Sequence, residues 1–139
     1  MWLQTQLQLS AKSRGFHLVT AEILTQLLEL KQFKVGLAHL FLQHTSASLA
    51  INENADRDVR LDLENYFLRS VPENQTYFRH TQEGADDMPA HIKSVIIGNS
   101  LSIPINRGQL ALGTWQGIYL CEHRHDAGKR QLIVTLHGE

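Results

Sequence analysis

The segment at residues 83–93, EGADDMPAHIK, holds the densest group of side chains that could do chemistry. It contains three carboxylates, an imidazole and an ammonium group, on Glu83, Asp86, Asp87, His91 and Lys93. Adjacent carboxylates suit Mg²⁺, and the backbone N–H groups at the start of a helix attract phosphate. The alternative is an acidic helix cap followed by a solvated helix face, which explains one aspartate but not the whole cluster. We therefore favour a functional site in this segment.

A second candidate is QHTSAS at residues 43–48, where a buried strand runs into small hydroxyl residues. A histidine at a strand end, here His44, is well placed to project into a cleft. The hydroxyl groups beside it could then orient a water molecule or bind an oxyanion. Equally, Ser and Thr residues in a turn can hydrogen-bond their own backbone. The spacing alone leaves both interpretations open.

Asparagine and aspartate alternate in NENADRD at residues 52–58. The pattern resembles the start of a calcium-binding loop, but Arg57 and Leu63 stand where that loop needs glycine and glutamate. Asp56 is better explained as the cap of a helix. Asn52 and Asn54 precede this helix and could still line a site.

The last third of the chain contributes two further motifs. Glycines flank Trp115 and Gln116, which suggests a bulge or a close backbone approach that aims these two side chains. In Glu122-His-Arg-His125, two histidines lie two residues apart on one strand face, a favourable geometry for a metal. Because His125 adjoins an expected turn, we interpret it as a solvated side chain.

The composition indicates one ordinary globular domain over residues 1–139. Lys and Arg number 13 against 14 Asp and Glu, and this formal net charge of −1 argues against a nucleic-acid partner. No apolar run approaches the roughly 18 residues that span a bilayer, and the N-terminus lacks a signal-peptide pattern. A single cysteine, Cys121, excludes an internal disulfide and a CxxC site. We therefore expect a cytoplasmic protein without a membrane partner.

The spacing of apolar residues predicts the elements that position these motifs. Leucine alternates with glutamine at residues 3–9, which predicts a strand with one solvated face. Thr20 can cap a helix whose apolar side chains share one face, namely Ile23, Leu24, Leu27 and Leu28. The next elements expected are strands at 35–42 and 47–51 and a helix at 56–70. Residues 71–87 are the longest polar stretch, where we expect a functional loop.

In the second half, Asp86 or Asp87 can cap a short helix that has Pro89 in its first turn and ends before Gly98. Four strands are then expected, at 101–105, 109–112, 115–122 and 130–137. The last two should pair as a hairpin across residues 125–128. Since strands joined by short turns are antiparallel, the fold class is α+β, with a mostly antiparallel sheet system and helices packed on it.

Five segments in this order resemble the YjbQ family: QHTSASL, NEN, EGADDMPAHIK, GTWQG and EHR with the following Arg130. The likeness runs from Ser10 to the C-terminus and so covers essentially the whole chain. It implies an α+β antiparallel β-sandwich with helices, assembled as a homotrimer. It also implies a secondary, weak thiamine phosphate synthase activity. That reaction joins hydroxymethylpyrimidine diphosphate to thiazole phosphate and releases pyrophosphate.

The same resemblance assigns roles to eight residues. It implies that four are catalytic, namely His44, Asp86, His91 and Lys93. It adds four cofactor-binding residues to the same site, namely Asn52, Trp115, Gln116 and Glu122, and small phosphorylated molecules as the substrates. Mg²⁺ on Asp86 or Asp87, with Lys93, would then hold the phosphates, and Trp115 would stack on the pyrimidine.

The competing interpretation is a metal- or ligand-binding homotrimer without a catalytic duty. His44 and His91, with a third ligand from Asp86, Glu122 or a neighbouring subunit, would hold a divalent ion, Mg²⁺ or Zn²⁺, and leave one position open. Binding through imidazoles would weaken below about pH 6, where histidine becomes protonated. We expect the site at or near a subunit boundary. The sequence leaves both functions open.

Overall fold

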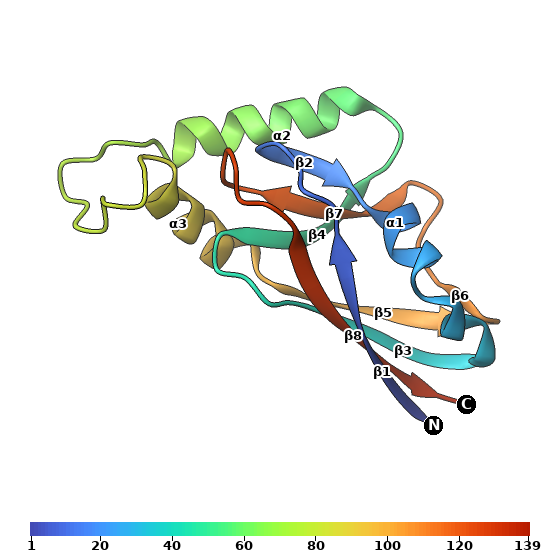
Figure 1. Cartoon of the computed structure of the whole chain (residues 1–139). Coiled ribbons are helices and arrows are strands. Elements are labelled where there is room, and N and C mark those ends of the chain that lie inside the picture. Colours follow the sequence, from blue (N-terminus) through green and yellow to red (C-terminus); the bar gives the residue numbers. More distant parts are fainter.

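Two antiparallel sheets and two longer helices make up the computed structural model, which describes residues 1–139 (Figure 1). The larger sheet contains, in spatial order, β1 (Trp2–Leu9), β8 (Arg130–Gly138), β3 (Val35–Leu42), β5 (Ser100–Asn106) and β6 (Gln109–Leu110). The smaller sheet contains β2 (Gly15–Leu18), β7 (Gln116–Glu122) and β4 (Ala47–Glu53). Every strand pair is antiparallel, which confirms the predicted α+β class.

The helical segments are α1 (Thr20–Thr25), the 3₁₀ turn η1 (Leu28–Gln32), α2 (Arg57–Ser70) and α3 (Asp87–Ile97). As predicted, Asp56 caps α2, because its carboxylate accepts a hydrogen bond from the Asp58 amide at 2.9 Å. Also as predicted, α3 ends at Gly98, whose φ of +100° is one that other residues rarely adopt. No helix is both long and apolar enough to cross a membrane.

The first helix differs from the prediction. Thr20 does not cap α1; its hydroxyl accepts a hydrogen bond from the Ile118 amide of β7 at 2.8 Å. The helix ends at Thr25, and of the four apolar residues expected on one face, Leu24 and Leu28 are exposed. The hydroxyl of Thr20 therefore ties α1 to the smaller sheet and leaves its own helix uncapped.

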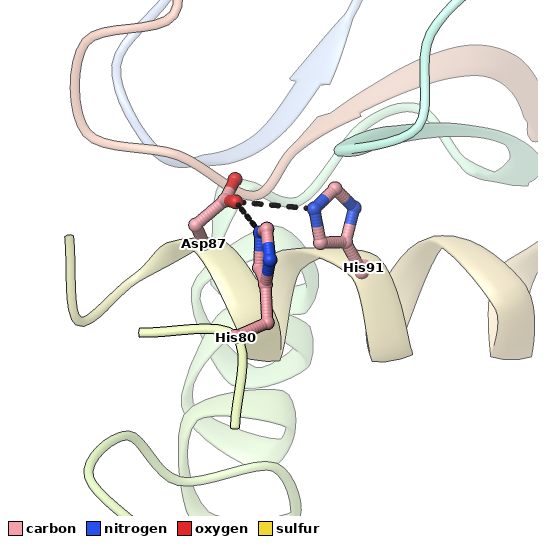
Figure 2. Close-up of side chains that lie close together, drawn as sticks. All are labelled: His80, Asp87 and His91. Carbon is pink, nitrogen blue, oxygen red and sulfur yellow. Dashed lines mark hydrogen bonds and ion pairs between the residues drawn. The ribbon is translucent and has the colours of Figure 1, made fainter. Parts of the chain in front are cut away.

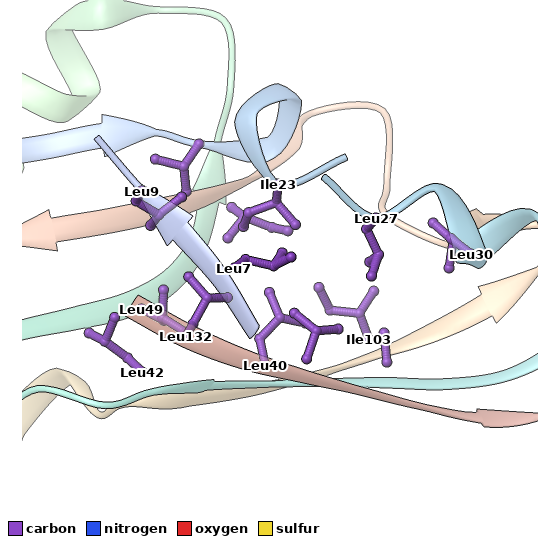
Figure 3. Close-up of a cluster of buried hydrophobic side chains, with 14 of the residues drawn as sticks. Leu7, Leu9, Ile23, Leu27, Leu30, Leu40, Leu42, Leu49, Ile103 and Leu132 are labelled. Carbon is purple, nitrogen blue, oxygen red and sulfur yellow. The ribbon is translucent and has the colours of Figure 1, made fainter. Parts of the chain in front are cut away.

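One hydrophobic core fills the space between the two sheets (Figure 3). The strand alternation explains this core: in β1, Leu7 and Leu9 face inward and are buried, while Gln6 and Gln8 are exposed. Leu40 and Leu132 approach from the larger sheet, and Leu49 approaches from the smaller one. Side chains of α1 and η1 close one side of this core. The arrangement is a β-sandwich, in which the inner faces of two sheets interdigitate.

The smaller sheet is buried on both faces. Ile118 and Leu120 of β7 belong to the sandwich core, whereas Tyr119 and Cys121 belong to a second cluster on the opposite face. Helix α2 covers this second face and contributes Phe67 to the cluster (Figure 1). Because β7 is central and covered on both sides, its sequence is a nearly continuous apolar run.

The predicted C-terminal hairpin is wrong. β7 pairs with β2 and β4 in the smaller sheet, while β8 pairs with β1 and β3 in the larger one. Residues 123–129 therefore cross from one sheet to the other. The sandwich requires this crossing, because β7 and β8 send their apolar side chains into the same core from opposite sides.

The core predicts a contrast between two leucines of β3. Leu40 is fully buried, whereas Leu37 on the same strand is 51% exposed. Leu40→Ala should lower the free energy of unfolding by about 2–5 kcal/mol, since it removes buried methyl groups and leaves a cavity. Leu37→Ala, the matched control, should change it by less than about 1 kcal/mol. Urea denaturation of the full chain measures both, and equal losses would contradict the assignment of the core.

Candidate functional site

Three side chains at the start of α3 form a compact group, which we call the His-Asp-His cluster: His80, Asp87 and His91 (Figure 2). Their ligand atoms all lie within 4.8 Å of one another. The Oδ2 atom of Asp87 is 2.7 Å from Nε2 of His80 and 3.1 Å from Nε2 of His91. Asp87 and His91 are four residues apart, so the helical turn places them on the same face.

The backbone fixes the proton of one imidazole. Nδ1 of His91 lies 2.9 Å from the carbonyl oxygen of Thr45, which can only accept a hydrogen bond, so Nδ1 is the donor. In the neutral ring, Nε2 then presents a lone pair to the Asp87 carboxylate. Nε2 of the neutral ring and Oδ2 of Asp87 are then both acceptors. Their contact at 3.1 Å needs a positive charge between them. That charge is either a proton on Nε2 or a metal ion.

The carboxylate of Asp87 is kept ionised. Its side chain is only 7% exposed, and its Oδ1 atom lies 3.2 Å from the Arg124 guanidinium. Burial acts to raise the pKa of Asp87, but the hydrogen bond from His80 and the charges of His91 and Arg124 outweigh it. The pKa of this carboxyl group therefore lies below its ordinary value, and Asp87 is available as an anionic ligand at neutral pH.

Asp86 does not belong to the His-Asp-His cluster, although the sequence places it in the predicted metal site. It stands at the N-cap position of α3, yet its carboxylate makes no cap hydrogen bond. Instead it accepts from the His125 amide at 3.0 Å and from Arg124 at 3.3 and 3.4 Å. Burial acts to raise the pKa of Asp86, and these bonds reverse the shift and lower it. Asp86 thus fastens the 123–129 crossing to α3 and positions Arg124 beside Asp87.

His44 does not join the His-Asp-His cluster. Its Nε2 accepts a hydrogen bond from the Gln131 amide at 2.8 Å, and its Nδ1 lies 3.3 Å from the Arg130 guanidinium. Burial and then the charge of Arg130 lower the pKa of His44, so its ring is neutral. Since its accepting nitrogen is occupied, His44 acts as a structural contact between the 43–46 segment and the start of β8.

Glu122 is buried as half of an ion pair. Its carboxylate accepts two hydrogen bonds from Arg130, at 2.8 and 2.6 Å. Glu122 is fully buried and Arg130 is 4% exposed. Arg130 also donates to the carbonyl and hydroxyl oxygens of Ser46. The pair therefore joins the end of β7 to the beginning of β8 and holds the segment that carries Thr45.

Lys93 and His123 are two further buried residues with ionisable side chains. Lys93 is 2% exposed and makes no hydrogen bond or ion pair, and burial lowers its pKa. The Nε2 atom of His123 shares a hydrogen bond of 2.9 Å with the hydroxyl of Ser48, and both residues are buried. Lys93 is therefore not at the surface of the helix N-terminus, where the phosphate interpretation needs it.

Three of the predicted site residues lie at the other end of the smaller sheet. In the β4–β7 pairing, Ala47 is opposite Glu122 and Asn52 is opposite Gly117. This register separates the Trp115–Gln116 turn from the His-Asp-His cluster by about six strand residues, or about 20 Å. Trp115 is 66% exposed, and both Asn52 and Gln116 are exposed. Within one chain, they do not share a cleft with His91.

His80 is not among the site residues predicted from the sequence. Asp86, and not Asp87, is the metal ligand predicted there. His80 lies in the 71–87 loop, seven residues before Asp87, and no periodic spacing connects the two. Only the fold of the loop brings its ring against α3 (Figure 2). The four-residue spacing of Asp87 and His91 on a helix was a signal that could have selected Asp87 over Asp86.

The fold and the cluster define a class: an antiparallel α+β sandwich with two imidazoles and a carboxylate at a helix start. A family model described as UPF0047 protein YjbQ-like matches residues 5–139. UPF0047 protein YjbQ of Escherichia coli O157:H7 is 59% identical over 139 residues, which is 100% of both chains. The chain therefore belongs to the YjbQ family.

Solved structures share this fold. An uncharacterized conserved protein of the yjbq/upf0047 family from Clostridium acetobutylicum is 31% identical, with a TM-score of 0.81, covering 96% of this chain and 99% of that one. A YbjQ-like protein of unknown function from Sulfolobus solfataricus P2 has a TM-score of 0.86 at 22% identity, covering 100% and 99% of the two chains. These similarities confirm the predicted family and fold.

The buried imidazole of His123 predicts a pH dependence of stability. Burial, followed by the charges of Lys93 and Arg130, lowers the pKa of His123 to about 3. In the unfolded chain the pKa of this histidine is about 6.5, so the unfolded state binds the proton more readily than the folded state does. The free energy of unfolding therefore falls as the pH drops from about 6.5 toward 3. At pH 5 this single group should lower the free energy of unfolding by about 2 kcal/mol relative to neutral pH.

Urea denaturation at a series of pH values measures this effect. His123→Gln should flatten the decline below about pH 6.5, because the ionisable ring is gone. His125→Gln removes an exposed histidine from the same crossing and should leave the decline as it is. Identical slopes for the parent and His123→Gln would contradict the prediction.

Proposed function

We propose that the His-Asp-His cluster binds a divalent metal ion and is the site of a secondary thiamine phosphate synthase activity. The observation that carries the proposal is the contact between two acceptors, Nε2 of His91 and Oδ2 of Asp87, at 3.1 Å. Thr45 holds the His91 ring in the tautomer that a metal requires. Backbone carbonyls commonly orient metal-binding histidines in this way.

The donor set favours a particular kind of metal. Two imidazole nitrogens and one carboxylate oxygen suit Zn²⁺ and similar transition metals, whereas Mg²⁺ prefers oxygen ligands alone. Three protein ligands leave a coordination position open, as in catalytic zinc sites. Of the two ions expected from the sequence, Zn²⁺ therefore fits His80, Asp87 and His91 better.

The surroundings of the cluster suit an anionic substrate. The guanidinium of Arg124 lies beside Asp87, and α3, whose backbone N–H groups favour anions, begins at this point. A bound metal would supply neutralisation of charge on a departing pyrophosphate. Arg124 would bind an oxygen of the diphosphate. The Thr45 carbonyl orients His91, and the Asp86 carboxylate holds Arg124 in place. The substrates proposed are the small phosphorylated molecules that the family resemblance implies.

The alternative is a non-catalytic metal- or ligand-binding homotrimer. It is favoured by the distance of about 20 Å between the cluster and the Trp115–Gln116 turn, which leaves no two-substrate cleft inside one chain. A trimer could bring that turn of one subunit toward the cluster of another. In the catalytic version of the proposal, a subunit boundary is the place where both substrates meet.

Metal binding is tested with protein purified without a histidine tag. Isothermal titration should show Zn²⁺ binding to the parent, with affinity falling below about pH 6 as the imidazoles become protonated. Asp87→Asn should weaken this binding at least about 100-fold, because it replaces an anionic ligand by a neutral amide of similar size. Asp62→Asn, on the exposed face of α2, is the matched control. An Asp87→Asn protein that binds Zn²⁺ like the parent would refute the site.

Catalysis is tested separately by pyrophosphate release from hydroxymethylpyrimidine diphosphate and thiazole phosphate. With Zn²⁺ or Mg²⁺ present, Asp87→Asn should reduce turnover on the order of 100-fold, as expected when transition-state charge loses its partner. Circular dichroism and light scattering verify that fold and assembly are retained. Zn²⁺ binding without turnover in the parent would reject the synthase and support the non-catalytic alternative.

A further inference from the structure

A second concave site, which we call the arginine cavity, lies between β2 and the first turns of α2. Its volume is about 340 Å³, and it contains none of the His-Asp-His cluster residues. Three guanidinium groups line it, those of Arg14, Arg57 and Arg60. The only carboxylate in the lining is that of Glu64.

The charges in this cavity do not cancel. Arg14 is paired twice, with Glu64 at 3.6 Å and with Glu73 at 3.5 Å. Arg57 and Arg60 have no ion-pair partner, although both face the same cavity. Because guanidinium groups stay protonated, the cavity keeps two uncompensated positive charges at every physiological pH.

Arg60 also has an unsatisfied donor. Its Nη1 atom is buried and has no hydrogen-bond partner. Buried donors without an acceptor are costly and rare in folded proteins. One helical turn further along α2, Oε1 of Glu64 is also buried without a hydrogen bond, and its charged partner is Arg14 at 3.6 Å. A ligand with acceptor oxygens would instead contact the guanidinium groups of Arg57 and Arg60 where they line the cavity.

Apolar side chains form another wall of the cavity. Leu61 of α2 is 48% exposed, and Phe16 of β2 also lines the space. A ligand with an apolar or aromatic body would cover Leu61 while its anionic group contacts the arginines. The volume of about 340 Å³ is within the range of small-molecule sites.

We propose that the arginine cavity binds a phosphate monoester with an apolar body, through Arg57 and Arg60. The forked donors of arginine match the oxygens of phosphate. This site is independent of the metal site, since the two have no residue in common.

The probe is phenyl phosphate, titrated calorimetrically into full-length protein that has been stripped of metal with a chelator and dialysed. The parent should bind it, and Arg60→Gln should weaken the binding at least about tenfold, because charge-assisted hydrogen bonds are lost. Arg57→Gln should weaken it as well. Inorganic phosphate, which lacks the apolar body, should bind more weakly than phenyl phosphate.

Two control variants show whether the binding belongs to this cavity. Arg69→Gln removes the same charge from an exposed position at the far end of α2 and should bind phenyl phosphate like the parent. Asp87→Asn disables the metal site and should also bind like the parent. Absence of millimolar binding to the parent, or equal weakening by Arg69→Gln, would overturn the proposal. If Arg60→Gln does not fold, Arg57→Gln at its exposed position decides the test.

Discussion

The buried ion pair between Glu122 and Arg130 is the constraint on which the site depends. It lies where the chain leaves the smaller sheet and enters the larger one, so it holds the two halves of the sandwich together at that end. Separating the two side chains would leave an uncompensated buried charge, which is energetically costly. The two residues therefore keep a fixed relative position. Arg130 also binds Ser46, and the neighbouring Thr45 carbonyl orients His91. The ion pair thereby fixes the backbone behind the His-Asp-His cluster.

Around this anchor, neighbouring acidic residues have separate duties. Asp86 binds the crossing between the sheets, whereas Asp87 faces two imidazoles. Arg124 contacts both carboxylates, and its positive charge offsets part of the repulsion between them. The consequence is a carboxylate that is buried, ionised and still directed at histidines. Apart from Arg124, the two neighbouring aspartates therefore make different contacts.

Local sequence signals predicted most elements but not their partners. The cap at Asp56, the end of α3 at Gly98 and the alternation of β1 all depend on neighbours along the chain, and all three were predicted. The predicted pairing of β7 with β8 was wrong, because an apolar run such as β7 does not reveal whether it pairs with the strand that follows it in sequence. β7 is buried on both faces and lies in the centre of the smaller sheet, whereas β8 lies in the larger sheet.

The sequence by itself determined the family, the α+β class and the concentration of ionisable side chains at the start of α3, since these follow from local patterns and residue order. The tertiary structure alone decided which side chains meet. His80 reaches Asp87 only through the folding of the 71–87 loop, and His44 turns to Arg130 because the crossing brings the start of β8 beside it. The smaller sheet separates Trp115 and Gln116 from the cluster, since antiparallel pairing sets the two ends of β7 a full strand length apart. Contacts between residues distant in sequence depend on packing, and packing is a property of the whole chain.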